Sequence, residues 1–410
     1  DTACGFQHSG RSALMTSAQK RALAHAELPV DHGNGAPKRL LVSSAGDECA
    51  RLRALPRCFD PGASPPPAAQ RPRKAVVLMR HGDRSNIAAK PGGLDLSHLQ
   101  PAWEQLMPSP EERAELGRFR VALGAQDGTN AYAKFVGTPP WGQLTSLGVA
   151  QCQRVGAELA RRYPEARIRA FSTNFPRTTQ SAAAVLLGFG AGSDVPITVR
   201  APADETLLPN FDGRCKRFTR LRAERKARAD EGSLRDMRDE LKTLLTPVLG
   251  EDPLAATLDF RPLCIHEGSL GIVDGIDWCL AWKCEQYHAS VEAHVYESAE
   301  LTRLACGRLL NWMVEEFRRP EQEVVLMLAH DNMITAFLVA LGIFRGEWPV
   351  YASAVVVETA DFDGKLKVRT TVNDEVRRDW QLWEDFVQSL SHVVMTEGEY
   401  ANVSGSEASL

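Results

Sequence analysis

Two short apolar runs constrain the fold of this chain more than any other feature. Residues 75–79 read AVVLM, residues 324–329 read VVLMLA, and neither run contains a polar residue. Runs of this length without alternation are typical of strands that are buried on both faces, as in a parallel sheet covered by helices. A third such strand is expected at residues 168–171. The pattern predicts an α/β fold.

Each of these runs ends in polar residues, and helical patterns follow. The first run continues into Arg80–Arg84 and the second into His330–Asn332. In open α/β sheets, ligands bind at the edge formed by the carboxyl ends of the strands. Helices are expected at 149–163, at 177–187 stopped by Gly188, and at 333–341 closed by Gly342.

The segment after the first run offers one imidazole, that of His81, between the guanidinium groups of Arg80 and Arg84. A guanidinium group binds phosphate oxygens through its rigid fork of donors. An imidazole that is neutral near its pKa can attack phosphorus. Gly82 is expected to let the backbone turn tightly beside the bound group. The alternative is a surface turn with solvated charges, which its position after a buried strand disfavours.

The segment after the second run places a carboxyl group next to a second histidine. His330 and Asp331 fit a phosphate ligand and a general acid, and the helix N-terminus adds N–H groups for an anion. Alternatively, Asp331 only caps the helix. Arg177 lies in the first turn of its own helix, where a solvent-facing arginine is the simpler interpretation.

Taken together and in order along the chain, five segments resemble the histidine acid phosphatases. The resemblance implies a central mixed, mostly parallel sheet flanked by helices, with a smaller, mostly helical cap domain. The cysteine-containing cap looks closer to the 2-phosphoxylose phosphatase branch of that family. The five segments are residues 80–84, 142–151, 177–182, 330–331 and 349–353.

The resemblance also implies residue roles. His81 is the expected nucleophile, which forms a phosphohistidine, and Asp331 is the acid that protonates the leaving alcohol and then helps to activate water. Four residues are expected to bind the phosphoryl oxygens: Arg80, Arg84, Arg177 and His330. Because arginines supply the positive charge, no metal or other cofactor is expected. The chain departs from the family pattern at Ser85–Asn86, where the family usually has a proline, and at Asn332, where it often has threonine.

Composition changes along the chain suggest its organisation. Residues 1–74 are expected to form an N-terminal extension with a Pro-rich linker at 61–72. Residues 75–200 and 320–395 are expected to form the α/β phosphatase core, residues 201–319 the helical cap, and residues 396–410 a flexible tail.

The stretch 214–242 has eleven basic and six acidic residues, 11 − 6 = +5. At the mouth of the site it could attract an anionic glycan, such as a glycosaminoglycan precursor, although a salt-bridged, solvated helix face is the preferred interpretation.

Charge and cysteine content bear on partners and compartment. The net charge is 48 − 52 = −4, which gives no indication of a nucleic-acid partner, and no apolar run is long enough to span a membrane. Nine cysteines without a CxxC pair or zinc spacing favour several disulfides and the secretory pathway over buried free thiols. The sequon at Asn402 allows glycosylation. Because the chain starts at Asp1, we expect a signal or anchor to have been removed; the sequence leaves the oligomeric state open.

The function expected from these residues is hydrolysis of phosphomonoesters. A phosphomutase of the same superfamily shares the phosphohistidine step, but Asp331 beside His330 favours hydrolysis. A non-catalytic relative that binds anionic glycans is the other alternative, and the presence of every expected catalytic residue disfavours it.

Overall fold

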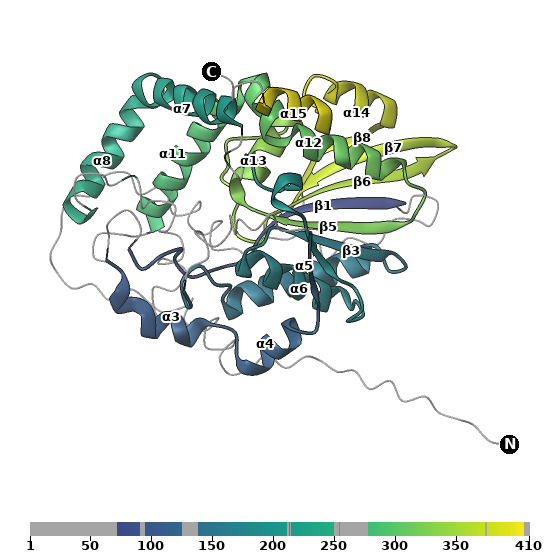
Figure 1. Cartoon of the computed structure of the whole chain (residues 1–410), viewed down its shortest axis with the longest axis horizontal. Helices are drawn as coiled ribbons and strands as arrows, with labels where there is room; N and C mark the ends of the chain where they lie inside the picture. The colour runs from purple at the N-terminus through teal and green to yellow at the C-terminus, as the bar shows by residue number, and fades with distance from the viewer. Residues whose placement is uncertain are drawn as a thin grey trace. The chain divides into compact units, whose positions relative to one another are not determined.

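A mixed sheet of eight strands forms the centre of the described chain (Figure 1). This computed structural model describes residues 72–90, 95–124, 138–210, 213, 215–249, 254, 278–373 and 375–405. The strand order is β2-β4-β3-β5-β1-β6-β7-β8, parallel from β2 to β1 and antiparallel from β1 to β8. The strands are β1 (Lys74–Arg80), β2 (Val121–Leu123), β3 (Arg167–Ser172), β4 (Ile197–Val199), β5 (Glu323–Ala329), β6 (Ala354–Phe362), β7 (Lys365–Val372) and β8 (Glu375–Leu382).

Helices cover both faces of this sheet (Figure 1). In chain order the α-helices are α3 (Gln100–Leu106), α4 (Pro110–Leu116), α5 (Ser146–Arg162), α6 (Pro176–Phe189), α7 (Lys216–Glu231), α8 (Arg235–Leu249), α11 (Trp278–Tyr296), α12 (Ala299–Arg318), α13 (Asp331–Ala340), α14 (Trp383–Leu390) and α15 (Glu397–Gly405). Short 3-10 turns lie at Ser97–Leu99 and Pro202–Asp204. The expected α/β class, with a mixed sheet between helices, is confirmed.

Strand β1 shows why the apolar run has no alternation. Val76 and Leu78 belong to one hydrophobic cluster, which also contains side chains of α12, α13 and α14. Val77 and Met79 belong to the cluster on the other face, with side chains of α5 and α6. Because residues 75–79 of β1 are buried and have no charged partner, a polar side chain on either face would lose its water, so both faces select apolar residues.

Helix α6 corrects one expectation. Gly188 does not stop the helix, which continues to Phe189 and ends at Gly190, whose φ of 78° is left-handed. A Cβ atom on Gly188 would lie 1.9 Å from the carbonyl oxygen of Gln153 in α5. The glycine therefore allows the two helices to pack closely, and it does not act as a terminator.

The C-terminal tail is a second correction, because helix α15 occupies part of the expected flexible segment 396–410. Its start is stabilised by a capping box, in which the N–H of Glu399 donates to Oγ1 of Thr396 (3.2 Å) and the N–H of Thr396 donates to Oε2 of Glu399 (2.8 Å). Arg308 of α12 pairs with Glu397 at 2.7 Å and stacks on Tyr400. Residues 406–410 lie outside the described residues.

The described part of the stretch predicted as a cap, residues 201–319, contains the helices α7, α8, α11 and α12 and the 3-10 turn Pro202–Asp204. The predicted linker at 61–72 and extension at 1–74 lie outside the described residues, apart from residues 72–74. Within the described part of the chain, no helix has the length and apolar character that crossing a membrane requires.

The described cysteines lie in packed interior positions. Cys152, Cys284 and Cys306 are buried free thiols, and burial raises the pKa of the Cys152 and Cys284 thiols to about 12. The Sγ atom of Cys215 accepts the N–H of Phe218 and so caps α7. The expectation of disulfides is therefore wrong for the first three, which the helices α5, α11 and α12 bury among apolar side chains. The side chains of the other cysteines lie outside the described residues: Cys4, Cys49, Cys58, Cys264 and Cys279.

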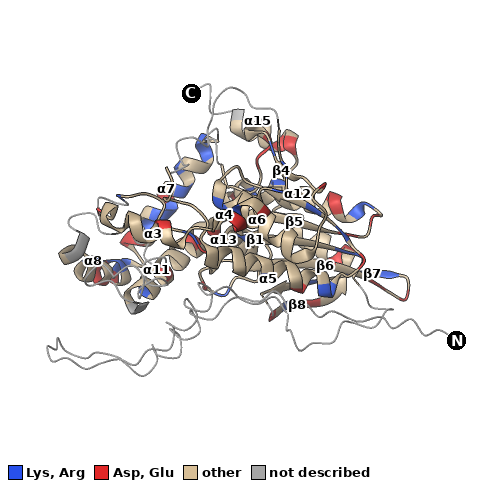
Figure 2. Ribbon diagram, turned by 90° about the horizontal axis from the view of Figure 1, so that it is seen from below, with Lys and Arg blue, Asp and Glu red and all other residues tan. Residues whose placement is uncertain are grey.

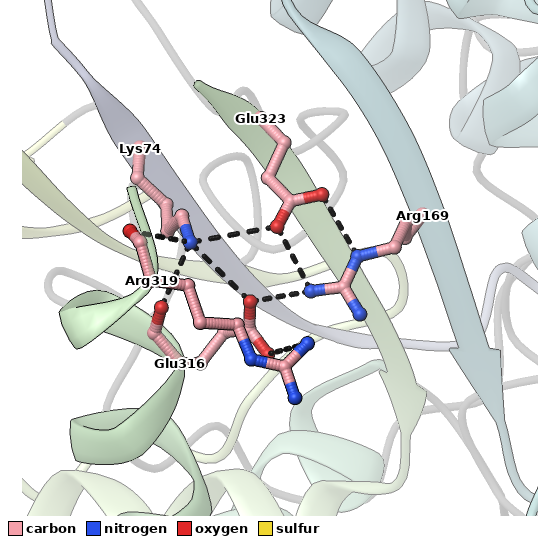
Figure 3. Close-up of polar contacts among 5 residues, drawn as sticks. All are labelled: Lys74, Arg169, Glu316, Arg319 and Glu323. Atoms are coloured by element: carbon pink, nitrogen blue, oxygen red, sulfur yellow. Dashed lines mark hydrogen bonds and ion pairs between the residues drawn. The ribbon is translucent and has the colours of Figure 1, made fainter. Parts of the chain in front are cut away.

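A buried charge cluster joins α12 to the amino ends of β1 and β5 (Figure 3). The Nζ atom of Lys74, which is 2% exposed, lies 3.3 Å from Oε1 of Glu316 and 3.4 Å from Oε1 of Glu323. It also donates to the carbonyl oxygens of Glu316 and Arg319. Arg169 of β3 pairs with both glutamates, so three strands and one helix share the cluster.

We expect Lys74→Met to lower the free energy of unfolding by about 3 kcal/mol, because it leaves buried carboxylates without one of their cations. Lys365→Met, at an exposed position in β7, is the matched control and should change stability little. Urea denaturation of both variants measures the difference. Equal midpoints for the two variants would contradict this account of the cluster.

Candidate active site

Three strands end side by side at one edge of the sheet. In the parallel register, Arg80 of β1 lies opposite Ala329 of β5, and Ser172 of β3 lies opposite Leu328. The ladder continues one residue further, since the N–H of His81 donates to the carbonyl oxygen of Ala329 (3.3 Å). The polar segments that follow the three strands are thereby brought to one place.

The loop after β1 lies directly on the N-terminus of α5. A Cβ atom on Gly82 would lie 2.5 Å from the carbonyl oxygen of Gly148, and one on Gly148 would lie 2.2 Å from that of Asp83. The N–H of Gly82 donates to Oγ of Ser181 at 3.0 Å. Gly82 is thus required for close backbone contact, and a left-handed turn is not the reason for it. The side chain of Asp83, fully buried, accepts the hydroxyl of Thr145 at 2.6 Å and holds the loop in place.

Arg80 and Asp331 form a direct ion pair, with 2.6 Å between Nη2 and Oδ2. Arg80 also donates to the carbonyl oxygen of Pro349 (2.7 Å) and lies 4.3 Å from the ring centroid of Tyr351. The side chain of Asp331 is 23% exposed, while that of Arg80 is 3% exposed. Asp331 does not cap α13: the residue at the N-cap is His330, and no side chain caps there.

The ring of His81 is held by its Nδ1 atom, which lies 2.8 Å from the carbonyl oxygen of Gly82. A carbonyl oxygen only accepts, so Nδ1 carries the proton and Nε2 keeps its lone pair. The ring centroid lies 5.5 Å from that of His330 and 5.6 Å from that of Tyr351. Among the described residues, no hydrogen-bond partner takes Nε2.

Burial and positive charge act together on the two histidines. Burial is the largest cause that lowers the pKa of His81 well below 6.5, followed by the charges of Arg177 and Arg80. The pKa of His330 is lowered well below 6.5 by burial and by the same two arginines. Arg84 lowers both pKa values as well. Both imidazoles are therefore neutral under mildly acidic conditions.

The remaining two arginines are buried beside aromatic rings. Arg177 is 8% exposed, and its guanidinium lies 4.5 Å from the ring centroid of Phe175. Arg84 is 3% exposed and lies 6.0 Å from the ring centroid of Tyr351, with Nη1 donating to the carbonyl oxygen of Ser85. The solvent-facing alternative for Arg177 is thus wrong. The structure brings all six predicted residues together: Arg80, His81, Arg84, Arg177, His330 and Asp331.

Helices of the predicted cap approach Asp331. Burial is the main cause that lowers the pKa of His288 in α11 to about 4; Lys226 of α7 lowers it further, while Asp331 raises it. His288 packs against Trp348, next to the carbonyl that receives Arg80, with 6.0 Å between ring centroids. The cap helices α7 and α11 therefore lie within electrostatic range of the site.

Basic residues recur along α7 (Figure 2), and most of its arginines have acidic partners. Arg222 pairs with Glu292 of α11, Arg225 with Glu297 and Arg217 with Glu300. This agrees with the preferred interpretation of a salt-bridged helix face. Lys216, Lys226 and Arg228 have no ion pair with any described residue.

Several residues that contact the six predicted ones were not singled out from the sequence. Tyr351, which lies against Arg80 and His81, belongs to the segment 349–353 that carried the resemblance, and this was the signal that could have found it. No sequence pattern indicated the role of Thr173, whose hydroxyl contacts His330. Within the described residues, no group of three or more His, Cys, Asp or Glu side chains is placed to hold a metal ion.

Residues 73–247 match the model of the histidine phosphatase superfamily (branch 2). Testicular acid phosphatase of Mus musculus is 30% identical over 251 residues, which cover 53% of this chain and 59% of that protein. Lysophosphatidic acid phosphatase type 6 of Bos taurus is 24% identical over 319 residues, 69% of this chain and 72% of that protein. The match thus spans less than two thirds of the mouse protein.

Solved structures share the fold at low sequence identity. The phytase from D. castellii has a TM-score of 0.53 and 17% identity, covering 87% of this chain and 88% of that one. Hafnia alvei phytase has a TM-score of 0.56 and 13% identity, covering 82% of this chain and 99% of that one. At such low identities, the similarity shows that the helices and strands are arranged in the same fold.

Proposed function

We propose that this chain is an acid phosphatase of the histidine phosphatase superfamily (branch 2), whose model residues 73–247 match, and that it acts through a phosphohistidine. One observation carries the proposal. The neutral imidazole of His81, with Nε2 open, lies within the electrostatic influence of three buried guanidinium groups, those of Arg80, Arg84 and Arg177. Such an arrangement suits a dianionic or monoanionic tetrahedral group beside a nucleophile.

In the proposed first step, the three arginines and His330 hold the non-bridging oxygens of the phosphoryl group. Nε2 of His81 attacks phosphorus, forming the P–N bond as the P–O bond to the leaving alcohol breaks. Asp331 transfers its proton to the leaving oxygen. Phosphoryl transfer depends mainly on positioning and charge neutralisation, which the arginines supply.

The ion pair between Arg80 and Asp331 has a role in this scheme. Before substrate binds, Nη2 of Arg80 lies 2.6 Å from Oδ2 of Asp331. A phosphoryl group that binds Arg80 competes for its donors, which weakens this ion pair and leaves the carboxyl group of Asp331 available to the leaving oxygen. In the second step Asp331 accepts a proton from a water molecule whose oxygen attacks phosphorus; the new P–O bond forms as the P–N bond to His81 breaks, and inorganic phosphate leaves.

Hydrolysis and phosphoryl transfer within a sugar phosphate share the first step. The test must therefore measure whether inorganic phosphate is released. We expect the wild-type protein at about pH 5 to release inorganic phosphate and p-nitrophenol in equal amounts from p-nitrophenyl phosphate. Conversion of a sugar phosphate to its isomer without free phosphate would support the phosphomutase. Absence of turnover on any phosphomonoester, by folded protein that binds phosphate, would support the non-catalytic anion binder.

A phosphorylated sugar or glycosaminoglycan precursor is the substrate class that we favour, and the 2-phosphoxylose phosphatase branch remains part of this proposal. The exposed lysines Lys216 and Lys226 on α7 support it, because they are not neutralised by described acidic residues. The secretory pathway lumen is the compartment that fits such a substrate. The exposed position of Asn402 on α15 is compatible with glycosylation there.

The pH dependence follows from the sign of the pKa shift at His81. Because burial and the arginines lower this pKa well below 6.5, Nε2 keeps its lone pair when the pH falls through that value. We expect kcat/KM to be at least as high at about pH 5 as at about pH 7, because the nucleophile keeps its lone pair throughout this range. A kcat/KM profile that falls on the acid side with an apparent pKa near that of free histidine would contradict this.

A further inference from the structure

The second histidine of the site is tied to a chain of two buried hydroxyl groups. Nε2 of His330 lies 3.0 Å from Oγ1 of Thr173, which lies 2.9 Å from Oγ1 of Thr178. Oγ1 of Thr178 lies 2.9 Å from the carbonyl oxygens of both Thr173 and Phe175. Both threonines are fully buried, so the network is closed to exchange with water.

The direction of the hydrogen bonds follows from the two carbonyl groups at the end of the chain. Carbonyl oxygens carry no proton, so the single hydroxyl proton of Thr178 must point toward them. If it pointed toward Thr173 instead, both short oxygen–oxygen contacts to carbonyls would lack a proton. Oγ1 of Thr178 therefore accepts from the hydroxyl of Thr173. The oxygen of Thr173 then accepts from His330, and the proton of this imidazole is on Nε2.

The other ring nitrogen of His330, Nδ1, is consequently a proton acceptor. It makes no hydrogen bond to any described residue, and it is not among the polar atoms that are sealed from solvent without a partner. The ring itself is fixed by edge contacts with Phe175 at 5.1 Å and with His81 at 5.5 Å between centroids. Nδ1 of His330 thus offers an acceptor beside the expected nucleophile, whereas the three arginines of the site only donate.

We propose that Thr173 and Thr178 fix His330 as an acceptor, so that the site takes the phosphoryl group with one proton still attached. This deepens the proposed function and rests on it: the P–OH group of the monoanion donates to Nδ1 of His330, while the arginines bind the other oxygens. The monoanion is abundant near or below about pH 6, the second pKa of a phosphomonoester. Thr173 and Thr178 are positioning residues here, because they act through His330.

The proposal predicts discrimination between phosphate and sulfate, which have the same shape but differ in protonation. At about pH 5 inorganic phosphate carries protons, whereas sulfate carries none and would face the lone pair of Nδ1. Protonation of His330 could relieve this contact, but its pKa is lowered well below 6.5. We expect wild-type protein to bind phosphate about tenfold to a hundredfold more tightly than sulfate, as for a lost hydrogen bond to a buried group.

Calorimetric titration with inorganic phosphate and with sulfate measures this ratio, and variants locate its cause. Thr173→Val removes the hydroxyl that accepts from Nε2, which frees His330 to carry its proton on Nδ1 and donate to sulfate. We expect the phosphate-to-sulfate ratio to fall by about fivefold or more, with Thr178→Val acting in the same direction. Thr173→Ser keeps the hydroxyl and should keep the ratio. Thr179→Val is the matched control, since the Thr179 hydroxyl hydrogen-bonds, within the described part of the chain, only to the carbonyls of Phe175 and Pro176.

Equal binding of phosphate and sulfate by the wild-type protein would overturn the proposal without any variant. An unchanged ratio in folded Thr173→Val and Thr178→Val would also overturn it. In either case, continued hydrolysis of p-nitrophenyl phosphate shows that the proposed function stands and only this inference fails. Wild-type protein that neither binds phosphate nor hydrolyses the ester would overturn both.

Discussion

His81→Ala should lower kcat for p-nitrophenyl phosphate by about 10⁴-fold or more, the largest effect expected of any single substitution. The reason is chemical: no other described nucleophile has an open lone pair beside the three arginines. Cys152 is no substitute, because burial raises the pKa of its thiol to about 12. The arginines remain, so the variant should still bind inorganic phosphate, and initial rates together with calorimetry separate the two effects.

His392→Ala is the matched control for this experiment. His392 is exposed after α14, and its loss should leave both rate and binding unchanged. A folded His81→Ala variant that retains a tenth or more of the wild-type rate would rule out His81 as the nucleophile. Loss of phosphate binding together with the rate would instead indicate that His81 mainly supports the pocket.

Asp331→Asn should lower kcat by about 10²-fold to 10⁴-fold for alkyl phosphates, because the asparagine cannot donate a proton to the leaving oxygen. For p-nitrophenyl phosphate the loss should be smaller, since nitrophenolate is stable without that proton. The difference between the two substrates is a sharper readout than either rate, because general disruption of the site slows both equally. Asp331 is suited to the test, because among the described residues its Oδ1 accepts only the adjacent N–H of Asn332 and its Oδ2 pairs with Arg80.

Asp385→Asn, at an exposed position in the first turn of α14, is the control for charge removal. It should have no effect on either substrate. If Asp331→Asn slows both substrates by the same factor, proton donation to the leaving group is not the function of Asp331. Asp331 would then serve only to position Arg80 through their ion pair.

Three of the eight strands, β1, β3 and β5, could be predicted from local sequence, as could five chemical groups: Arg80, His81, Arg84, His330 and Asp331. The runs at 75–79 and 324–329 are apolar because helices cover both faces of β1 and β5. Burial on both faces can therefore be recognised from the sequence as a run without polar residues. Polar residues at the strand ends pointed to one edge of the sheet, where Arg80, His81 and Asp331 indeed lie together.

Features that depend on contacts between residues far apart in the sequence could not be predicted from local sequence. Arg177 viewed alone resembles a surface residue, yet it is buried at the start of α6 with its guanidinium beside the ring of Phe175. Gly188 was misread because a glycine that ends a helix and one that admits a neighbouring helix look alike in sequence. Thr173 contacts His330 because β3 and β5 are neighbours in the sheet, although the two strands are far apart in the sequence.

The tail shows a different kind of error. Its polar composition suggested flexibility, yet Thr396 and Glu399 stand at capping-box spacing and were overlooked. The cysteines were misjudged for a related reason, since counts alone do not distinguish cross-linked from buried thiols. Cys284 and Cys306 are packed inside the apolar cluster that joins α11 and α12 to the sheet.

The most direct test of the account is to trap the phosphorylated protein and locate the phosphate. Asp331→Asn, mixed rapidly with p-nitrophenyl phosphate and quenched in alkali, should accumulate phosphohistidine, because it forms the intermediate faster than it activates water. Peptide mass spectrometry should then find the phosphate on His81 alone, and the His81→Ala/Asp331→Asn double variant should carry none. Phosphate on another residue, or unlabelled protein that nevertheless turns over, would contradict the central claim that His81 is the nucleophile of a phosphate pocket.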